Sequence, residues 1–186
     1  MKAVFLDRDG TVTVEKGHLG NPDDLELHAG AADAIRRLRE AGWSVFVVTN
    51  QSGVARGMFT EEELASVHFR MVAMLGAEGA SIDGLYSCPH HPEGRVLEYA
   101  VDCDCRKPRP GLILQAAREH GVDLASSVIV GDARRDIDAG RSAGLAACVL
   151  VLTGHGAETA KTIHGADAVV ADIQAAADWI LSVELG

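Results

Sequence analysis

The chain has 186 residues, of which 47% are hydrophobic, and its 17 basic and 27 acidic side chains give a formal net charge of −10. This length and composition predict one globular domain with a substantial core over residues 1–186. The acidic balance argues against a nucleic-acid or anionic-membrane partner. No apolar run is long enough to span a membrane, and the opening MKAVFLDRDG has no signal-peptide pattern, which predicts a cytoplasmic protein. In that compartment, four cysteines indicate metal binding or burial rather than disulfides.

Apolar runs alternate with helical patterns from the start of the chain. The run AVFL predicts a buried strand at residues 3–6. The apolar period of residues 31–42 predicts a helix that ends in a glycine cap. Residues 44–49 predict a second strand, and its unbroken apolar core indicates that both of its faces are covered.

The alternation continues to the end of the chain. A helix is predicted over residues 60–79, beginning with Thr60 and Glu63 spaced as a capping box. The remaining elements are, in order, strand 84–88, helix 111–121, strand 127–131, helix 136–144, strand 146–152, strand 167–170 and helix 173–185. This order predicts a three-layer α/β fold, a doubly wound parallel sheet with helices on both faces. The irregular segments 12–30 and 89–110 have the length of functional loops.

Polar side chains gather in four segments, VFLDRDGT, VVTNQS, CDCRKP and VGDARRD, at predicted strand ends or before the helix at 111–121. The residues are Asp7, Asp9, Thr49, Asn50, Gln51, Ser52, Arg106, Lys107, Asp132 and Asp136. Open α/β sheets bind ligands at the carboxyl ends of their strands. Each segment alone is ordinary as a turn, a helix cap or a solvated loop, but the four together predict one site.

The first of these segments sets Asp7 and Asp9 two residues apart, and alternate side chains of a strand share a face. Like charges that close repel each other, and burial strengthens the repulsion. A hard cation with oxygen ligands would remove the repulsion and would also neutralise a phosphate ester for attack. Asp7 would then attack phosphorus to form an aspartyl-phosphate, while Asp9 handles the leaving-group proton.

Three cysteines and a histidine form a C-x-H…C-x-C pattern at Cys88, His90, Cys103 and Cys105, with twelve residues between the two halves. These side chains are a complete ligand set for tetrahedral zinc. Because the set leaves no coordination position open, it indicates a structural rather than a catalytic ion. Spacing favours His90 over its neighbour His91. An ion there would fix the two cationic residues that follow the last cysteine.

The order FLDRDGT, VVTNQSGVARG, CDCRKPRPG and VGDARRD resembles the haloacid dehalogenase (HAD) superfamily of phosphohydrolases. Within it, the chain is similar over nearly its whole length to the D-glycero-D-manno-heptose 1,7-bisphosphate 7-phosphatases, with TNQSGVARG and CPHHP…CDCRKP as the most specific matches. The resemblance implies that Asp7 is the nucleophile and Asp9 the general acid/base. It also implies that Thr49 and Lys107 stabilise the phosphoryl group and that Arg106 contributes to substrate recognition.

The same resemblance implies two metal sites. Magnesium would be held by the Asp7 side chain, the Asp9 backbone carbonyl and Asp132, with Asp136 in support. The family also places zinc at the four cysteine and histidine positions above. Cys148, inside the apolar run AACVLVL, is then a core residue.

Two places depart from the family's pattern. The family has an Asp-His-Gly-Tyr-like stretch that touches the sugar, whereas residues 15–18 here read EKGH and retain only the glycine. We predict that the substrate contacts are Glu15, Gly17, His18, Asn50, Gln51, Ser52 and Arg106. Ala133 stands where the family often has a lysine, and Arg134 or Arg135 would have to supply that charge.

The segment lengths predict no large cap domain, so the zinc loop, about residues 88–105, would act as a partial lid. The leading prediction is a monomeric phosphatase that removes the 7-phosphate of heptose 1,7-bisphosphate during ADP- or GDP-heptose synthesis for lipopolysaccharide core or surface glycans. Histidinol-phosphate phosphatase shares all the motifs, but Ser52 and the twelve-residue gap favour the heptose enzyme. The motifs are also compatible with another small-molecule HAD phosphatase, a phosphotransferase or a non-catalytic phosphate-binding module.

Overall fold

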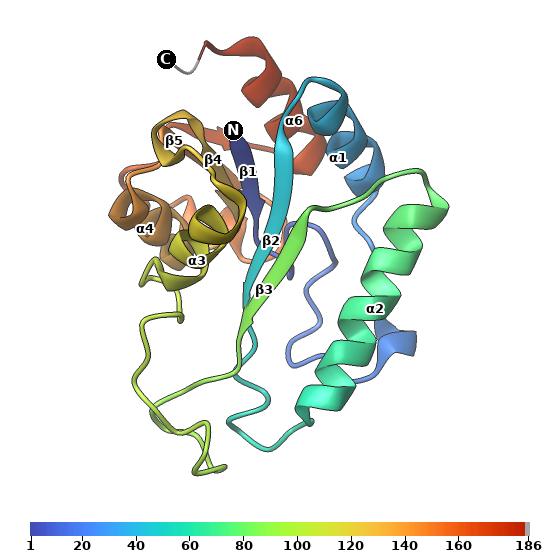
Figure 1. The fold of residues 1–186 in the computed structure, drawn as a ribbon, viewed down its shortest axis with the longest axis vertical. Helices are drawn as coiled ribbons and strands as arrows, with labels where there is room; N and C mark the ends of the chain where they lie inside the picture. Colours follow the sequence, from blue (N-terminus) through green and yellow to red (C-terminus); the bar gives the residue numbers. More distant parts are fainter. Residues whose placement is uncertain (185–186) are drawn as a thin grey trace.

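The computed structural model describes residues 1–184 as a six-stranded sheet covered by helices on both sides (Figure 1). The strands are β1 (Ala3–Leu6), β2 (Ser44–Asn50), β3 (Gly84–Cys88), β4 (Val128–Gly131), β5 (Ala147–Val151) and β6 (Ala168–Val170). The helices are α1 (Ala31–Glu40), α2 (Glu61–Ala77), α3 (Gly111–His120), α4 (Arg134–Ala143), α5 (Gly156–Thr159) and α6 (Ile173–Ser182), with 3₁₀ turns η1 (Pro22–Asp24) and η2 (Leu124–Ser126). All pairings are parallel, in the order β3-β2-β1-β4-β5-β6. The predicted three-layer α/β fold is confirmed.

The predicted elements match the observed ones to within about two residues, apart from the last helix. Predicted over 173–185, that helix ends at Ser182, and Leu185 lies outside the described residues. Helix α4 begins two residues earlier than predicted, because Asp136 accepts the backbone N–H of Ala133 (3.0 Å) and caps the first turn. The short elements η1, η2 and α5 were not predicted, since three or four residues carry no apolar period.

Alternate residues of the central strands face two separate cores. On β1, Val4 and Leu6 pack with α1, α2 and α6, whereas Ala3 and Phe5 pack with α3 and α4 on the other side. The Phe5 ring stacks on the ring of Phe46 in β2, with their centroids 5.6 Å apart. Because both faces of these strands are buried, their apolar runs are unbroken.

The two irregular segments both follow the carboxyl ends of strands, 12–30 after β1 and 89–110 after β3. The first folds back on itself through an antiparallel bridge between Thr13 and Leu27. Neither segment carries an inserted cap domain within residues 1–184, as predicted. Over the same residues, no helix combines the length and the hydropathy needed to cross a membrane.

Two glycines inside helices provide a matched test of how closely α4 packs on the sheet. A Cβ added to Gly140 in α4 would lie 2.4 Å from Cγ2 of Ile129 and 2.7 Å from Sγ of Cys148, whereas one added to Gly76 in α2 would meet no atom within 4 Å. We expect Gly140→Ala to lower the free energy of unfolding by about 1–3 kcal/mol through overpacking. Gly76→Ala should raise it by about 0.5–1 kcal/mol, because alanine favours the helix. Urea denaturation checks both, and a change of the same sign in the two variants would contradict this packing.

Candidate active site

A cavity of about 230 Å³ opens at the carboxyl ends of β1 and β2. Its lining comprises Asp7, Asp9, Glu15, Gly17, His18, Thr49, Asn50, Gln51, Ser52, Arg106, Arg135 and His155. Ten of these twelve residues were predicted as site residues from the sequence. Of the other residues predicted for this site, Lys107 is buried and pairs with Asp7 and Asp136, and Asp132 is buried close to both carboxylates.

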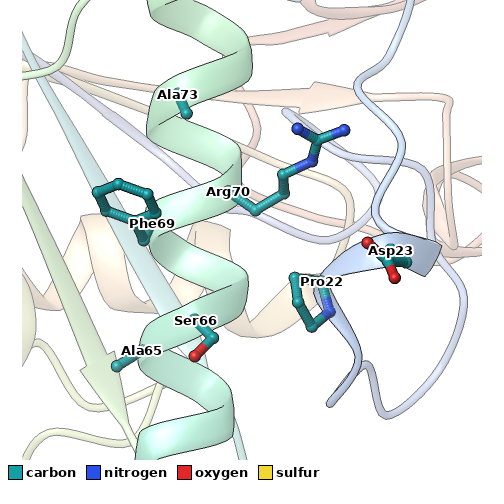
Figure 2. A pocket seen from close by; sticks show the side chains of 7 residues that line it. All are labelled: Pro22, Asp23, Ala65, Ser66, Phe69, Arg70 and Ala73. Atoms are coloured by element: carbon teal, nitrogen blue, oxygen red, sulfur yellow. The ribbon is translucent and has the colours of Figure 1, made fainter.

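A larger hollow of about 610 Å³ lies between α2 and η1 (Figure 2). It is lined by Pro22, Asp23, Ala65, Ser66, Phe69, Arg70 and Ala73. None of these residues belongs to the four polar segments of the sequence. The smaller cavity is therefore the candidate active site.

Asp7 is buried directly after β1, and its backbone N–H continues the sheet by donating to the carbonyl oxygen of Val130 (2.9 Å). Its Oδ1 lies 3.0 Å from Nζ of Lys107 and accepts the backbone N–H of Arg8 (2.7 Å). Its Oδ2 lies 3.9 Å from Nη2 of Arg135. One oxygen of the carboxylate is thus fixed by close donors, while the other has only a distant cation.

Lys107 sits at the centre of the buried charges. Its Nζ lies 2.6 Å from Oδ1 of Asp136 and donates to the carbonyl oxygen of Val48 (2.7 Å). Burial lowers the pKa of Lys107, but the charges of Asp136 and Asp7 outweigh burial and raise it above its ordinary value. The side chain is therefore a fixed cation beside Asp7.

Asp9 is held by a separate group of donors. Because β1 ends at Leu6, Asp7 and Asp9 follow the strand, so the alternation assumed from the sequence does not set their directions. Both oxygens of Asp9 bind the guanidinium of Arg8, at 2.9 and 2.8 Å, and Oδ2 also accepts Nε2 of Gln51 (2.8 Å). The two carboxylates therefore have different counter-ions, Lys107 for Asp7 and Arg8 for Asp9.

Three carboxylates converge on one point next to the cavity. One oxygen each of Asp7, Asp132 and Asp136 lie within 4.8 Å of one another, and all three residues are buried. Oδ2 of Asp132 accepts the backbone N–H of His155 (2.7 Å), while its Oδ1 is buried without a hydrogen-bond partner. Burial, followed by the charge of Asp7, raises the pKa of Asp132 to about 7. An orphaned buried oxygen among carboxylates fits a hard cation such as magnesium.

Gly10 leaves the room for this carboxylate cluster. Its φ is +80°, and a Cβ on it would lie 2.2 Å from Oδ2 of Asp132. Thr153 approaches from the loop after β5 and donates to the carbonyl oxygen of Gly10 (2.5 Å). The predicted role of the Asp9 backbone carbonyl as a magnesium ligand stays a prediction.

The amides after β2 are engaged by the protein itself. The Asn50 side chain donates to the carbonyl oxygen of Lys107 (2.9 Å) and accepts its backbone N–H (3.0 Å). Gln51 donates to Asp9 and to Oγ1 of Thr49 (2.9 Å). Both line the cavity, and their amides hold catalytic candidates in place; their role as substrate contacts stays a prediction.

Cys88, His90, Cys103 and Cys105 converge as the sequence predicts. Cys105 Sγ lies 3.0 Å from Sγ of Cys88, 3.2 Å from Sγ of Cys103 and 3.3 Å from Nδ1 of His90. Hydrogen bonding with Cys88 and burial raise the pKa of the Cys105 thiol, so a bound cation would displace its proton. Three cysteine sulfurs and one histidine imidazole with this spacing fit zinc.

The structure decides between neighbouring residues around this loop. His91 turns away from the cysteines, with Nε2 3.1 Å from Nη2 of Arg56. Cys148 lies in the core that faces α3 and α4. The loop also contacts the site directly, since the carbonyl oxygen of Cys88 accepts the backbone N–H of Gln51 (2.7 Å).

The two arginines after Ala133 point in different directions. Arg135 lines the cavity beside Asp7, whereas Arg134 donates to the carbonyl oxygen of Thr162 (2.5 Å) at the surface. Of the two, Arg135 is thus the one that places a cation beside Asp7. Arg106 also lines the cavity and is half-buried.

His155 is the cavity residue that the sequence did not reveal. It comes from the loop TGHG after β5, where a histidine between glycines has no distinguishing pattern. Its Nε2 lies 3.8 Å from Oε2 of Glu15, whose Oε1 accepts the backbone N–H of Gly17 (2.6 Å). The segment after β1 and the loop after β5 therefore meet at one side of the cavity.

Known proteins are similar to this chain in sequence and in fold. A HAD-hydrolase-like family model matches residues 104–176. A D-glycero-beta-D-manno-heptose-1,7-bisphosphate 7-phosphatase of Yersinia pestis is 45% identical over 180 residues, which are 97% of this chain and 89% of that protein. The chain belongs to this family of HAD phosphatases. Its relative in Escherichia coli K12 is 41% identical over 97% of this chain and 88% of that protein.

Solved structures of the heptose bisphosphate phosphatase family agree with the fold. The D,D-heptose 1,7-bisphosphate phosphatase of B. bronchiseptica, complexed with magnesium and phosphate, superposes with a TM-score of 0.86 at 39% identity, covering 97% of this chain and 98% of that one. The enzyme of Burkholderia thailandensis gives a TM-score of 0.72 at 32% identity, covering 98% and 100%.

The raised pKa of Asp132 predicts a pH-dependent response to magnesium. Without metal, the folded protein favours protonated Asp132, so the stability from this group is present at acidic pH and lost as the pH rises through about 7. Magnesium binds the ionised form and must displace that proton at low pH. We therefore expect MgCl₂ to raise the melting temperature more at pH 8 than at pH 5.5. Equal shifts, or a shift retained in Asp132→Asn, would contradict the assignment.

The cysteine and histidine cluster predicts that zinc content and activity fall together. Cys103→Ser removes one thiolate from the cluster and should lower both zinc content and activity. The reason is that the loop with the cysteines leads directly into Lys107, whose backbone is held by Asn50. Cys148→Ser, a cysteine outside the cluster, should retain its zinc. Elemental analysis beside phosphate release makes the comparison. A zinc-free Cys103→Ser protein with unchanged kcat/KM would refute the coupling.

Proposed function

We propose that this protein hydrolyses the 7-phosphate of D-glycero-D-manno-heptose 1,7-bisphosphate through an aspartyl-phosphate on Asp7, within ADP- or GDP-heptose synthesis for lipopolysaccharide core or surface glycans. The observation that carries the proposal is Asp7 itself. This carboxylate lines the cavity with Lys107 against one oxygen and two further carboxylates within reach of one cation. The 45% identity to a phosphatase of that specificity supports the substrate.

The contacts of Asp7 favour Oδ2 as the attacking atom. Lys107 and the backbone N–H of Arg8 fix Oδ1, which leaves Oδ2 to bond to phosphorus. The bond between phosphorus and the C7 oxygen then breaks, and Asp9 gives that oxygen a proton. In the second half, Asp9 takes a proton from a water molecule, which attacks phosphorus, releases inorganic phosphate and frees Asp7.

The phosphoryl charge would be offset by donors already in place. Thr49 accepts a hydrogen bond from Gln51, so its own hydroxyl proton is free to point at a phosphoryl oxygen. Lys107 adds a fixed positive charge. Magnesium, held by Asp7, Asp132 and the Asp9 carbonyl with support from Asp136, would supply the remaining charge neutralisation.

The rest of the cavity suits a polar, extended substrate. Ser52, Glu15, Gly17 and His18 offer hydroxyl, carboxylate, backbone and imidazole groups to sugar hydroxyls, and Arg106 offers a cation. We assign these residues to substrate binding, together with His155, which the cavity adds. The zinc loop would cover one side as a partial lid. Zinc itself would be structural, since four donors leave it no open position.

Turnover of two substrates under identical conditions tests the proposal. With magnesium, we expect kcat/KM for heptose 1,7-bisphosphate to exceed that for histidinol phosphate by at least about 100-fold, a difference of about 2.7 kcal/mol in transition-state binding. Asp7→Asn should abolish phosphate release from both, because the nucleophile is lost. Preference for histidinol phosphate would overturn the substrate. Magnesium-dependent release of phosphate by Asp7→Asn would overturn the mechanism.

A further inference from the structure

Arg8 lies between the two aspartates in sequence, yet its side chain is fully buried, with 0% of its surface exposed. Its guanidinium forms a fork on Asp9, with Nε 2.9 Å from Oδ1 and Nη2 2.8 Å from Oδ2. Paired guanidinium and carboxylate groups of this kind fix orientation as well as distance. An arginine is rarely buried to this extent unless its charge has a specific partner.

The other contacts of Asp9 complete the same arrangement. Thr13 donates its hydroxyl to Oδ1 (3.2 Å), and Gln51 donates to Oδ2 (2.8 Å), so each oxygen has two donors. The Asp9 side chain is nevertheless 14% exposed and lines the cavity. The carboxylate is therefore held by four donors while part of it remains open to the cavity.

Arg8 also lies near helix α2, whose His68 is affected by its charge. His68 of α2 is close enough that the charge of Arg8, added to the larger effect of burial, lowers the pKa of that histidine to about 3. Nη1 of Arg8 is buried without a hydrogen-bond partner. The guanidinium is thus shielded from solvent, and its strong contacts are with Asp9, one of the acids that line the cavity.

We propose that Arg8 is the positioning residue for proton transfer: it holds the carboxylate of Asp9 in line with the leaving oxygen. This role rests on the proposed function of Asp9 as general acid and base. The two-point contact prevents the carboxylate from turning about its own axis, which a single cation would allow. Misplacing a catalytic group by about 1 Å can cost a factor of 10² in rate, so losing the fork should be visible in kcat.

The leaving group gives a readout that separates positioning from general damage. An alkyl phosphate needs a proton on its leaving oxygen, whereas p-nitrophenolate leaves without one. For Arg8→Met and Arg8→Lys, we expect kcat for heptose 1,7-bisphosphate to fall about 100-fold. The first-turnover burst of p-nitrophenolate from p-nitrophenyl phosphate, measured by stopped flow, should fall less than about threefold. Equal losses in both measurements would overturn the proposal, since a distorted cavity affects both substrates alike.

A double-mutant cycle tests whether Arg8 acts through Asp9. In the Asp9→Asn background, Arg8→Met should lower kcat for the alkyl phosphate by less than about twofold, because the group it positions is already gone. A further 100-fold loss would show an independent role and refute the assignment. Thermal unfolding of each variant confirms that the compared proteins are folded.

A milder variant keeps the test valid if a substituted Arg8 does not fold. Thr13→Val removes one of the four donors to Asp9 at nearly constant volume. It should show the same split between alkyl and aryl phosphates on a smaller scale, about threefold to tenfold. Equal losses for alkyl and aryl phosphates in Thr13→Val would count against the proposal. The comparison needs only an alkyl phosphate that the wild-type protein hydrolyses. A negative result would therefore refute the role of Arg8 without bearing on heptose bisphosphate as the substrate. If Asp9→Asn itself lowered turnover of alkyl and aryl phosphates equally, the proposed role of Asp9 as general acid would be refuted instead.

Discussion

The active site depends on a buried ammonium group, that of Lys107, held between the carboxylates of Asp7 and Asp136. Removing such charges from water costs several kcal/mol for each ion, and only close pairing offsets the cost. The pairing therefore requires that β1, α4 and the end of the zinc loop meet at one point. A parallel sheet provides that point, because the ends of neighbouring strands lie side by side.

The zinc loop is connected to this charge cluster through the backbone. Asn50, the last residue of β2, binds both the N–H and the carbonyl of Lys107, and the next residue binds the carbonyl of Cys88. The zinc loop is thereby hydrogen-bonded to the end of β2 at two places, at its first cysteine and just after its last one. A structural ion bound at the cysteines would stabilise the position of the ammonium group without touching the substrate.

The site separates its acids by giving each a different partner. Asp7 has Lys107 and Asp9 has Arg8, so the proposed nucleophile and the proposed proton carrier have separate counter-ions. Asp132 keeps a buried oxygen without a partner, which is where a divalent cation would be bound most strongly. This division explains how several carboxylates share one small cavity in an acidic protein.

The sequence by itself determined the layers of the fold, the succession of strands and helices along the chain and the four segments that form the site, because apolar periodicity and strand-end chemistry are local properties. It also predicted that Cys88, His90, Cys103 and Cys105 come together, since donor type and spacing define such a cluster. Only the tertiary structure decided that His90 rather than His91 joins the cysteines, that Arg135 rather than Arg134 lines the cavity, and that the Asn50 amide binds the backbone of Lys107. Side-chain direction is set by packing between segments far apart in the chain, and no local pattern records it.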